Sequence, residues 1–448
     1  VDIDYLGFTI PNLFVVGYDD QSIYGWRGAK IENIHRFNRD FGPCETIRLE
    51  QNYRSSEVIL SAANSLIKNN ESRLGKELWT DINGGDKITL YGGFNELDEA
   101  RFIAERIRAS YREGVAYQDM AVLYRSNAQS RVIEQALRSY QIPYKIYGGL
   151  RFFDRAEIKD ALAYLRLLVN ANDDPAFERV INMPPRGIGE KTLSSIREEA
   201  REKEISLWHA IEALIPTITA GRVSNGMRSF LEIIAHLHET AKQKTFPELI
   251  QEMFQVSGLL VYVKGQPGER TFAKLENLQE LITASKQFEE AYCENEEPKV
   301  RMAAEVLPNF LSEVALDAGD RDQEDENTVK LMTLHSAKGL EFPLVFLAGL
   351  EEGLFPHHRC AQDQDLLEEE RRLCYVGVTR AMKKLTLSYA EKRTFAGSSG
   401  IARPSRFIKE IPQQLIEPLA MNTSVRPPAT FGSRSIQIAA NNIAEAAA

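Results

Sequence analysis

The chain has 448 residues, of which 43% are hydrophobic, so it is long enough for about two to four domains with apolar cores. Its formal net charge of −10 excludes a protein that is basic throughout, although local basic patches stay compatible with nucleic-acid binding. Four scattered cysteines without a Cys-x-x-Cys pair predict neither a zinc site nor a disulfide framework. No apolar run reaches the roughly 18 residues of a membrane span, and no signal-peptide pattern is seen. We therefore expect a cytoplasmic protein with no membrane partner.

An apolar run at 13–16 is followed by a loop that combines acids, an amide, two aromatic residues and an arginine. The run predicts a short buried strand, and the loop at 17–28 then lies at a strand end, where α/β proteins place nucleotide chemistry. A carboxamide there could sense a phosphate, and an aromatic ring could stack on a base. The alternative is a glycine-rich turn whose aromatic residues fill a local core.

Helical and strand patterns alternate over residues 51–147, which predicts a mostly parallel sheet. Helices are expected over 56–69, 96–111 and 131–140, and strands over 87–91, 120–124 and 144–147. At the start of the first helix, the Tyr53 ring could stack on a nucleobase and the Arg54 fork could hold a phosphate. The alternative there is a surface salt bridge beside a core tyrosine.

After Gly148 and Gly149 the pattern becomes helical, beginning with a helix expected over 157–169 and continuing to about residue 315. The α/β pattern then returns, with strands expected over 328–333, 344–348 and 384–389 and a helix over 366–379. The simplest arrangement is one α/β domain interrupted by an inserted helical domain. From about residue 421, a stretch rich in Pro, Ser, Ala and Asn predicts a disordered tail.

Two segments of the returning α/β pattern carry further candidate groups. At 333–342, hydroxyl, imidazole and ammonium groups could hold a nucleic-acid phosphate, and Glu341 could accept a hydrogen bond from a ribose hydroxyl. The alternative is a polar loop with His335 buried. The helix at 366–379 begins with acids, which suit the helix dipole, and continues with basic and aromatic residues. Its alternative is a solvated, ion-paired helix.

The four segments together resemble motifs III, IV, V and VI of the UvrD/Rep/PcrA family of superfamily 1 DNA helicases. They read GYDDQSIYGWRG at 17–28, QNYRS at 51–55, TLHSAKGLEF at 333–342 and EEERRLCYVGVTRA at 368–381. The resemblance includes LYRSNAQSR at 123–131, YGGLRFF at 147–153 and RGIG at 186–189. It covers about residues 13–415, and the UvrD branch of the family is the nearest.

The resemblance implies an α/β fold, in which a RecA-like parallel-sheet motor domain contains an inserted all-helical domain. The expected divisions are a remnant of a first RecA-like domain at 1–50, the second RecA-like domain at 51–147 and 328–420, the inserted helical domain at 148–327, and the tail at 421–448. The implied activity is that of an ATP-dependent 3′–5′ DNA helicase that acts in DNA repair and replication.

The resemblance also implies a role for each motif residue that the chain retains. At the nucleotide, Gln21 would sense the γ-phosphate, Tyr53 would stack on adenine, Glu341 would bind the ribose, and Arg54 and Arg380 would hold the γ-phosphate. At the DNA, Tyr24, Trp26, Arg27 and His335 would contact the single strand, and Arg186, Gly187 and Gly189 would grip duplex phosphates. ATP and Mg²⁺ are the implied cofactors; single-stranded and duplex DNA, with DNA-repair proteins, are the implied partners.

Three features depart from the family pattern. The Gly-x-x-x-x-Gly-Lys-[Ser/Thr] phosphate loop does not occur in the sequence. The acidic pair for magnesium is matched only loosely, at 1–5, so no metal ligand is assigned. Position 18 is tyrosine where the family usually has aspartate. We therefore expect the C-terminal two-thirds of a helicase. The alternative is a non-catalytic DNA- or partner-binding module derived from one.

Overall fold

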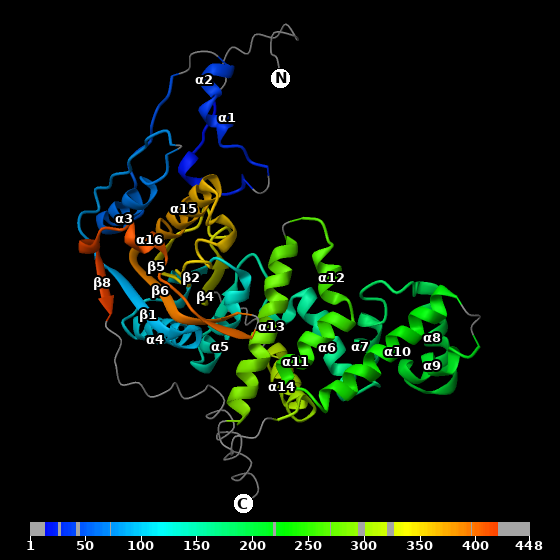
Figure 1. The fold of residues 1–448 in the computed structure, drawn as a ribbon. Coiled ribbons are helices and arrows are strands. Elements are labelled where there is room, and N and C mark those ends of the chain that lie inside the picture. Colours follow the sequence, from blue (N-terminus) through cyan, green and yellow to red (C-terminus); the bar gives the residue numbers. More distant parts are fainter. Residues whose placement is uncertain are drawn as a thin grey trace, which may run out of the picture.

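The computed structural model describes residues 14–25, 28–41, 45–71, 73–217, 221–268, 270–293, 301–319, 327–395 and 397–419. They form an α/β part around a largely parallel sheet and a helical part beside it (Figure 1). The predicted α/β fold class is thereby confirmed. Among these residues, no helix is both long and apolar enough to cross a membrane. The tail predicted from residue 421 lies outside the described residues.

The α/β part is built on an eight-stranded sheet with the order β3-β4-β2-β5-β6-β1-β8, and β7 pairs with β6. Every pairing is parallel except β6 with β7. The strands are β1 (Ile88–Asn95), β2 (Met120–Tyr124), β3 (Tyr144–Ile146), β4 (Val329–Thr333), β5 (Phe342–Leu347), β6 (Ala381–Phe395), β7 (Ser398–Ile401) and β8 (Ile416–Leu419). The interior strand β2 is buried along its whole length, as expected when helices cover both faces of a parallel sheet.

Helices pack on both faces of the sheet. One face carries α4 (Glu96–Arg112) and α5 (Ser130–Ser139), and the other carries α3 (Glu57–Ile67), α15 (Gln364–Val378) and α16 (Arg406–Lys409). Successive side chains of a strand point to opposite faces, so Val345 and Phe346 of β5 belong to different apolar cores. Two short helices, α1 (Glu32–His35) and α2 (Phe37–Asp40), precede the sheet.

The helical part lies in the sequence between β3 and β4, which are neighbours in the sheet. Its helices are α6 (Ala156–Val169), α7 (Asp174–Val180), α8 (Glu190–Lys203), α9 (Leu207–Leu214), α10 (Arg222–Ala241), α11 (Phe246–Val256), α12 (Leu259–Lys264), α13 (Arg270–Cys293) and α14 (Ala303–Gly319). They share an apolar core of their own, which includes Phe177, Phe230 and Met253. The domain divisions drawn from the sequence stay a prediction.

The strand predicted over 13–16 is wrong for the residues that the structure describes. Residues 14–16 form no strand, and Phe14 and Val16 are 85% and 82% exposed. A buried strand needs neighbours along its edges, and none of the described strands pairs with this segment. An apolar composition cannot supply those neighbours.

Candidate functional site

Arg54 and Arg380 are brought together where α3 and β6 begin. The Asn52 side-chain oxygen accepts hydrogen bonds from the backbone N–H groups of Arg54 (2.9 Å) and Ser55 (2.8 Å), which fixes the chain just before α3. The Ser55 hydroxyl donates to the carbonyl of Ala381 at 2.7 Å. The residue after Arg54 is thus bonded to the residue after Arg380.

Arg380 is buried without a carboxylate partner among the described residues. Its guanidinium donates to the carbonyls of Val376 (3.0 Å) and Leu340 (2.9 Å) and to the Thr379 hydroxyl (3.1 Å), and it is 1% exposed. Burial, together with the charge of Arg54, lowers the pKa of Arg380 to about 10. A buried cation held only by neutral oxygens keeps a charge that a bound anion would offset.

Arg54 forms an ion pair with Glu341, the residue expected at the ribose. Arg54 Nε lies 2.5 Å from Glu341 Oε2, and both side chains are partly exposed. Exposed pairs of this kind contribute only about 0–1 kcal/mol, so a phosphate could replace the carboxylate at small cost. Among the residues that the structure describes, Arg54 alone of the two arginines therefore has a carboxylate partner, and a ligand can displace it.

The Tyr53 ring is exposed and tethered by its hydroxyl. The hydroxyl donates to Gln51 Oε1 at 2.7 Å, and Gln51 Nε2 donates in turn to Asp81 at 2.7 Å. The side chain is 79% exposed, so the face of the ring is open to a flat ligand beside Arg54.

Gln21 ends a 3₁₀ turn, Asp19–Gln21, that contacts the loop after β4. Lys338 Nζ donates to the Gln21 carbonyl at 2.7 Å. Burial and the charge of Arg380 lower the pKa of Lys338. Lys338 is therefore bonded to the turn that carries Gln21, and its charge is opposed by that of the buried Arg380.

Tyr24 and His335, both expected at single-stranded DNA, lie together. The Tyr24 hydroxyl donates to the His335 carbonyl at 3.3 Å, and the ring centroids are 6.5 Å apart. Ile23 is fully buried in the core below α15 and fixes the loop between Gln21 and Tyr24. Trp26 and Arg27, predicted for the same strand, lie outside the described residues.

The predicted duplex-binding loop lies in the helical part, between α7 and α8, away from α3 and α15 (Figure 1). Arg186 is half-buried and donates inward, to the Tyr164 hydroxyl (2.6 Å) and the carbonyls of Val180 (3.0 Å) and Ser257 (3.2 Å). Its side chain therefore holds the loop from inside. Gly187 has a positive φ of 78°, which favours glycine, and Gly189 caps α8.

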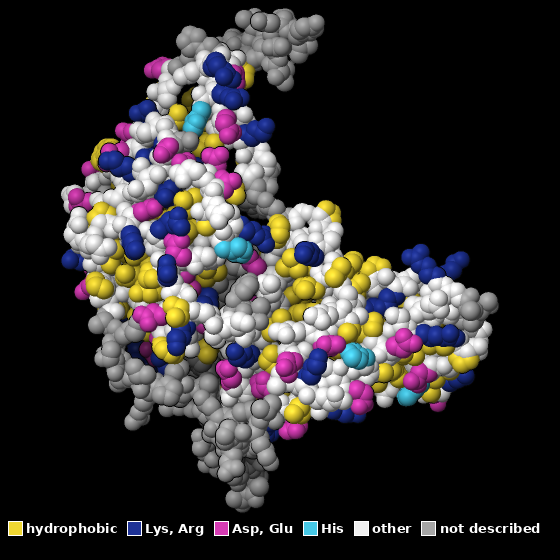
Figure 2. Space-filling model, viewed as in Figure 1, with side chains coloured by type: hydrophobic (Ala, Val, Ile, Leu, Met, Phe, Trp, Pro, Cys, Tyr) yellow, Lys and Arg dark blue, Asp and Glu magenta, His cyan; other side chains and the backbone are white. Residues whose placement is uncertain are grey.

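Basic side chains gather around α8 at the far end of the helical part, on the face shown in Figure 2. A helix N-terminus offers unpaired backbone N–H groups and a positive dipole end. The glycine loop and the start of α8 thus present backbone donors beside basic side chains, although α8 begins with Glu190 and carries equal numbers of acidic and basic residues.

Two family models match the chain. One, described as the UvrD-like helicase C-terminal domain, matches residues 47–392, and the other, the UvrD/REP helicase N-terminal domain, matches residues 3–42. The chain belongs to the UvrD-like helicase family. The resemblance drawn from the motifs is confirmed.

Relatives match almost the whole chain. DNA helicase II of Escherichia coli K12 is 51% identical over 418 residues, which are 93% of this chain and 57% of that protein. ATP-dependent DNA helicase PcrA of Staphylococcus aureus (strain COL) is 42% identical over 417 residues, 93% of this chain and 56% of that protein. The chain thus spans little more than half the length of these relatives.

The structure adds a contact that the sequence analysis missed. Arg73 donates to both carboxylate oxygens of Asp20, from Nε and Nη2 at 2.7 Å each, and the Leu74 N–H donates to Asp19 at 2.7 Å. We call these four residues the docking contact. Burial raises the pKa of Asp20 and Arg73 opposes that rise, while Asp20 raises the pKa of Arg73. Arg73 and Leu74 belong to no motif, so no sequence signal pointed to them.

Further contacts hold the same loop against α15. The hydroxyls of Tyr18 and Tyr375 are hydrogen-bonded, and burial raises the pKa of Tyr18 to about 12. Arg372 Nε donates to the Ser22 carbonyl at 3.0 Å, and the Gly25 N–H donates to Glu369 at 3.1 Å. The tyrosine at position 18 is therefore accommodated by a tyrosine of motif VI.

The helix α15 is ion-paired, as the alternative expected, but no residue from Leu367 to Val378 is exposed, so the solvated part of that alternative is wrong. Arg371 and Arg372 are 5% and 7% exposed. Arg371 forms a two-pronged pair with Glu410, at 2.8 and 2.9 Å, and also donates to Asn70. The charged run is buried because neighbouring segments supply partners that the sequence pattern does not reveal.

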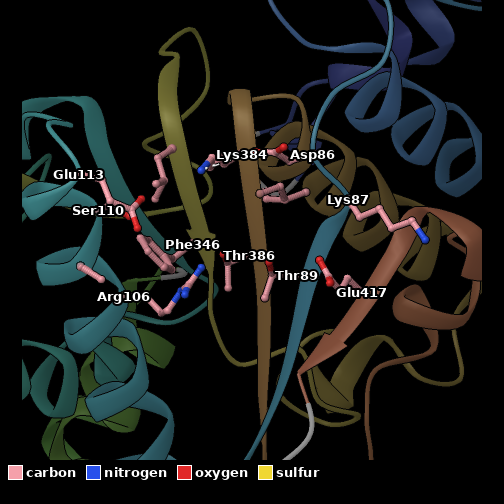
Figure 3. Close-up of a pocket in the computed structure, with 13 residues that line it drawn as sticks. Asp86, Lys87, Thr89, Arg106, Ser110, Glu113, Phe346, Lys384, Thr386 and Glu417 are labelled. Atoms are coloured by element: carbon pink, nitrogen blue, oxygen red, sulfur yellow. Dashed lines mark ion pairs between the residues drawn. The ribbon is translucent and has the colours of Figure 1, made fainter.

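A polar hollow of about 220 Å³ lies elsewhere, between α4 and strands β5, β6 and β1 (Figure 3). Thr89 and Thr386 lie side by side in its floor, and Lys384 pairs with Asp86 at 3.5 Å. Its lining includes three basic residues (Lys87, Arg106, Lys384) and three acids (Asp86, Glu113, Glu417). Since these charges balance and no predicted site residue lines it, it is not part of the candidate site.

The described residues contain no group of three or more His, Cys, Asp or Glu side chains arranged to hold a metal ion.

Proposed function

We propose that this chain supplies the second motor domain of an ATP-dependent DNA helicase of the UvrD type, together with the loop that carries Gln21. The observation that carries the proposal is the pair of arginines with one displaceable carboxylate: Arg380 is buried among neutral oxygens, and Arg54 donates to the exposed Glu341 and to the Thr379 carbonyl. A triphosphate matches this surplus of guanidinium donors. The names of the relatives, which include an ATP-dependent DNA helicase, support the same reading.

In this proposal the nucleotide replaces Glu341 on Arg54. Arg54 and Arg380 then hold the γ-phosphate and stabilise the charge that develops during phosphoryl transfer. Glu341, once released, accepts hydrogen bonds from the ribose, and the exposed Tyr53 ring stacks on adenine. Gln21 senses the γ-phosphate from the turn that Lys338 holds.

The DNA contacts proposed for the chain come from two regions. Tyr24 and His335, with Trp26 and Arg27, contact the single strand, where an aromatic ring can stack on any base. Backbone N–H groups at Gly187 and Gly189 contact duplex phosphates, with Arg186 holding the loop in shape. The 3′–5′ direction, the role in repair, the repair partners, the magnesium ion, the cytoplasmic location and the domain divisions follow from the family resemblance.

A second candidate function is a non-catalytic DNA- or partner-binding module derived from a helicase. The observation that favours it is the lack of a Gly-x-x-x-x-Gly-Lys-[Ser/Thr] pattern in the 448 residues, because that loop cradles the phosphates in the family. Both candidate functions require DNA binding. They differ in whether ATP is hydrolysed.

A chimera distinguishes the two. In E. coli DNA helicase II, the 418 matched residues are replaced by those of this chain. We expect hydrolysis of ATP that single-stranded DNA stimulates. A chimera that folds and binds DNA but does not hydrolyse ATP would support the non-catalytic module.

The 448-residue chain alone provides the complementary test. We expect it to bind single-stranded DNA with an affinity that falls as salt rises, because phosphate contacts release counterions. We expect no DNA-stimulated ATP hydrolysis, because its sequence contains no phosphate loop. Turnover by the purified chain that Arg380→Ala abolishes would contradict this expectation.

A further inference from the structure

The docking contact joins the loop that carries Gln21 and Tyr24 to a segment outside every motif. We propose that Arg73 is a positioning residue, which fixes this loop against α15 so that the nucleotide and DNA contacts form one rigid unit. The proposal rests on the proposed function, because Gln21 and Tyr24 matter only if nucleotide and DNA bind.

The contact is buried and directional. The side chains of Asp20 and Arg73 are only 2% and 14% exposed, and the two are joined by two parallel hydrogen bonds of 2.7 Å. Arg73 Nη2 also donates to the Lys76 carbonyl at 2.8 Å, which fixes the guanidinium within its own segment. A two-pronged pair of this kind restricts orientation as well as distance. It therefore sets the direction in which the turn Asp19–Gln21 faces.

The segment that carries Arg73 is itself bonded to α15. Asn70 Nδ2 donates to the Glu368 carbonyl at 3.0 Å, and the Glu71 N–H donates to the Glu368 carboxylate at 2.9 Å. Arg371 Nη1 donates to the Asn70 side-chain oxygen at 2.6 Å. A chain of contacts thus connects the turn that carries Gln21, through Arg73, to α15. Arg380 lies just after the end of that helix.

Stability alone is a poor explanation for this pair. Desolvating two charges costs about as much as their attraction returns, so an apolar pair of similar size would stabilise the fold equally well. What an apolar pair cannot do is hold one orientation. We therefore expect the ion pair to matter for the order of the loop more than for the stability of the fold.

The experiment uses the 448-residue chain and two measurements: hydrogen exchange of amides at 17–25, and affinity for single-stranded DNA over a range of salt concentrations. In Arg73→Met, exchange at 17–25 should rise, and affinity should fall by about tenfold as the stacking contact of Tyr24 is lost. The slope of affinity against salt should not change, because Arg73 contacts no phosphate. A slope that falls by about one would overturn the proposal, because Arg73 would then be a direct DNA contact.

Two further variants separate positioning from folding. Arg125→Met is the matched control, since Arg125 donates from Nε and Nη2 to the two carboxylate oxygens of Glu370 on α15, at 3.1 and 2.7 Å, without a hydrogen bond to residues 17–25. It should leave exchange at 17–25 unchanged. The double variant Asp20→Leu/Arg73→Met removes both charges, so it should regain thermal stability without regaining loop protection. Wild-type protection and affinity in the double variant would overturn the proposal.

The same data distinguish this proposal from the proposed function. If the wild-type chain does not bind single-stranded DNA, the proposed function fails, and exchange at 17–25 still decides the role of Arg73. If Arg73→Met does not fold, Arg73→Lys is used in its place. Lysine retains the positive charge but cannot donate the two parallel hydrogen bonds of a guanidinium. Raised exchange at 17–25 in a folded Arg73→Lys would support the proposal, and wild-type exchange would overturn it.

Discussion

The α/β part and the helical part bury different kinds of side chain. The helices α6–α14 pack around apolar residues such as Phe177, Phe230 and Met253, and among the described residues of these helices Glu157 alone is both charged and buried. The α/β part buries many charged side chains. They include Asp20, Glu99, Glu351, Glu368, Glu370, Arg371, Arg372 and Arg380.

The buried charges are concentrated near the candidate site. An apolar core tolerates hydrophobic substitutions that nearly conserve volume, whereas a buried charge requires each partner in its place. Several of these charged groups lie along α15 and around Arg380, where the proposed nucleotide contacts converge. We therefore expect the loss of one buried charge in the α/β part to lower the free energy of unfolding strongly. Small apolar substitutions in the helical part should lower it only a little.

The largest effect is expected at Arg393, which contacts two buried carboxylates. Its Nη2 lies 2.6 Å from Glu99 and 2.5 Å from Glu351. Burial opposes the charge of Arg393, yet the two carboxylates raise its pKa well above the ordinary value. Arg393→Met leaves both acids buried and unpaired, so urea unfolding should show a loss of about 3–5 kcal/mol.

The control for Arg393 is Arg406→Met, which breaks a more exposed pair with Glu352 in the same part of the molecule. We expect it to cost less than about 1 kcal/mol. Equal losses in the two variants would remove the distinction between buried and exposed charges.

A smaller effect is expected from Ile250→Val in the helical part. Ile250 is fully buried on α11, and the substitution removes one methylene-sized group without leaving a charge unpaired. Urea unfolding should show a loss of about 0.5–1.5 kcal/mol. A loss above about 3 kcal/mol would mean that a small apolar substitution in the helical core costs as much stability as the loss of a buried charge.

The smallest effect is expected from Arg179→Met on α7. Arg179 pairs with Asp160 at 2.8 Å, and its side chain is 38% exposed. We expect a change in unfolding free energy below about 1 kcal/mol, and one that shrinks further in high salt. A salt-independent loss of several kcal/mol would show that charge pairs also organise the helical part.

Local patterns predicted the elements well. The strand expected over 120–124 is β2, and the helix expected over 96–111 is α4 (Glu96–Arg112), because burial periodicity is a property of the segment itself. The strand expected over 384–389 is part of a longer one, β6 (Ala381–Phe395). Its outer end carries charged residues, which a search for apolar runs does not detect.

Contacts between distant segments could not be predicted from the sequence. Arg54 meets Glu341 across 287 positions, and Asp20 meets Arg73 across 53. Each residue has a plausible solvated alternative when considered alone, so only the fold decides its partner. Motif resemblance named Arg54 and Glu341 as site residues, yet it did not indicate that they pair with each other. Arg73 lies outside every motif, so the resemblance did not indicate it.

The role of Arg380 at the γ-phosphate is best tested by ATP hydrolysis in the chimera with E. coli DNA helicase II, compared between wild type and Arg380→Ala. We expect Arg380→Ala to lower DNA-stimulated turnover by about 10³–10⁵, the range found for arginines that stabilise charge in phosphoryl transfer. Single-stranded DNA binding should be retained, with Arg179→Ala as the control that leaves turnover unchanged. Near-normal turnover in a folded Arg380→Ala chimera would show that Arg380 does not hold the γ-phosphate.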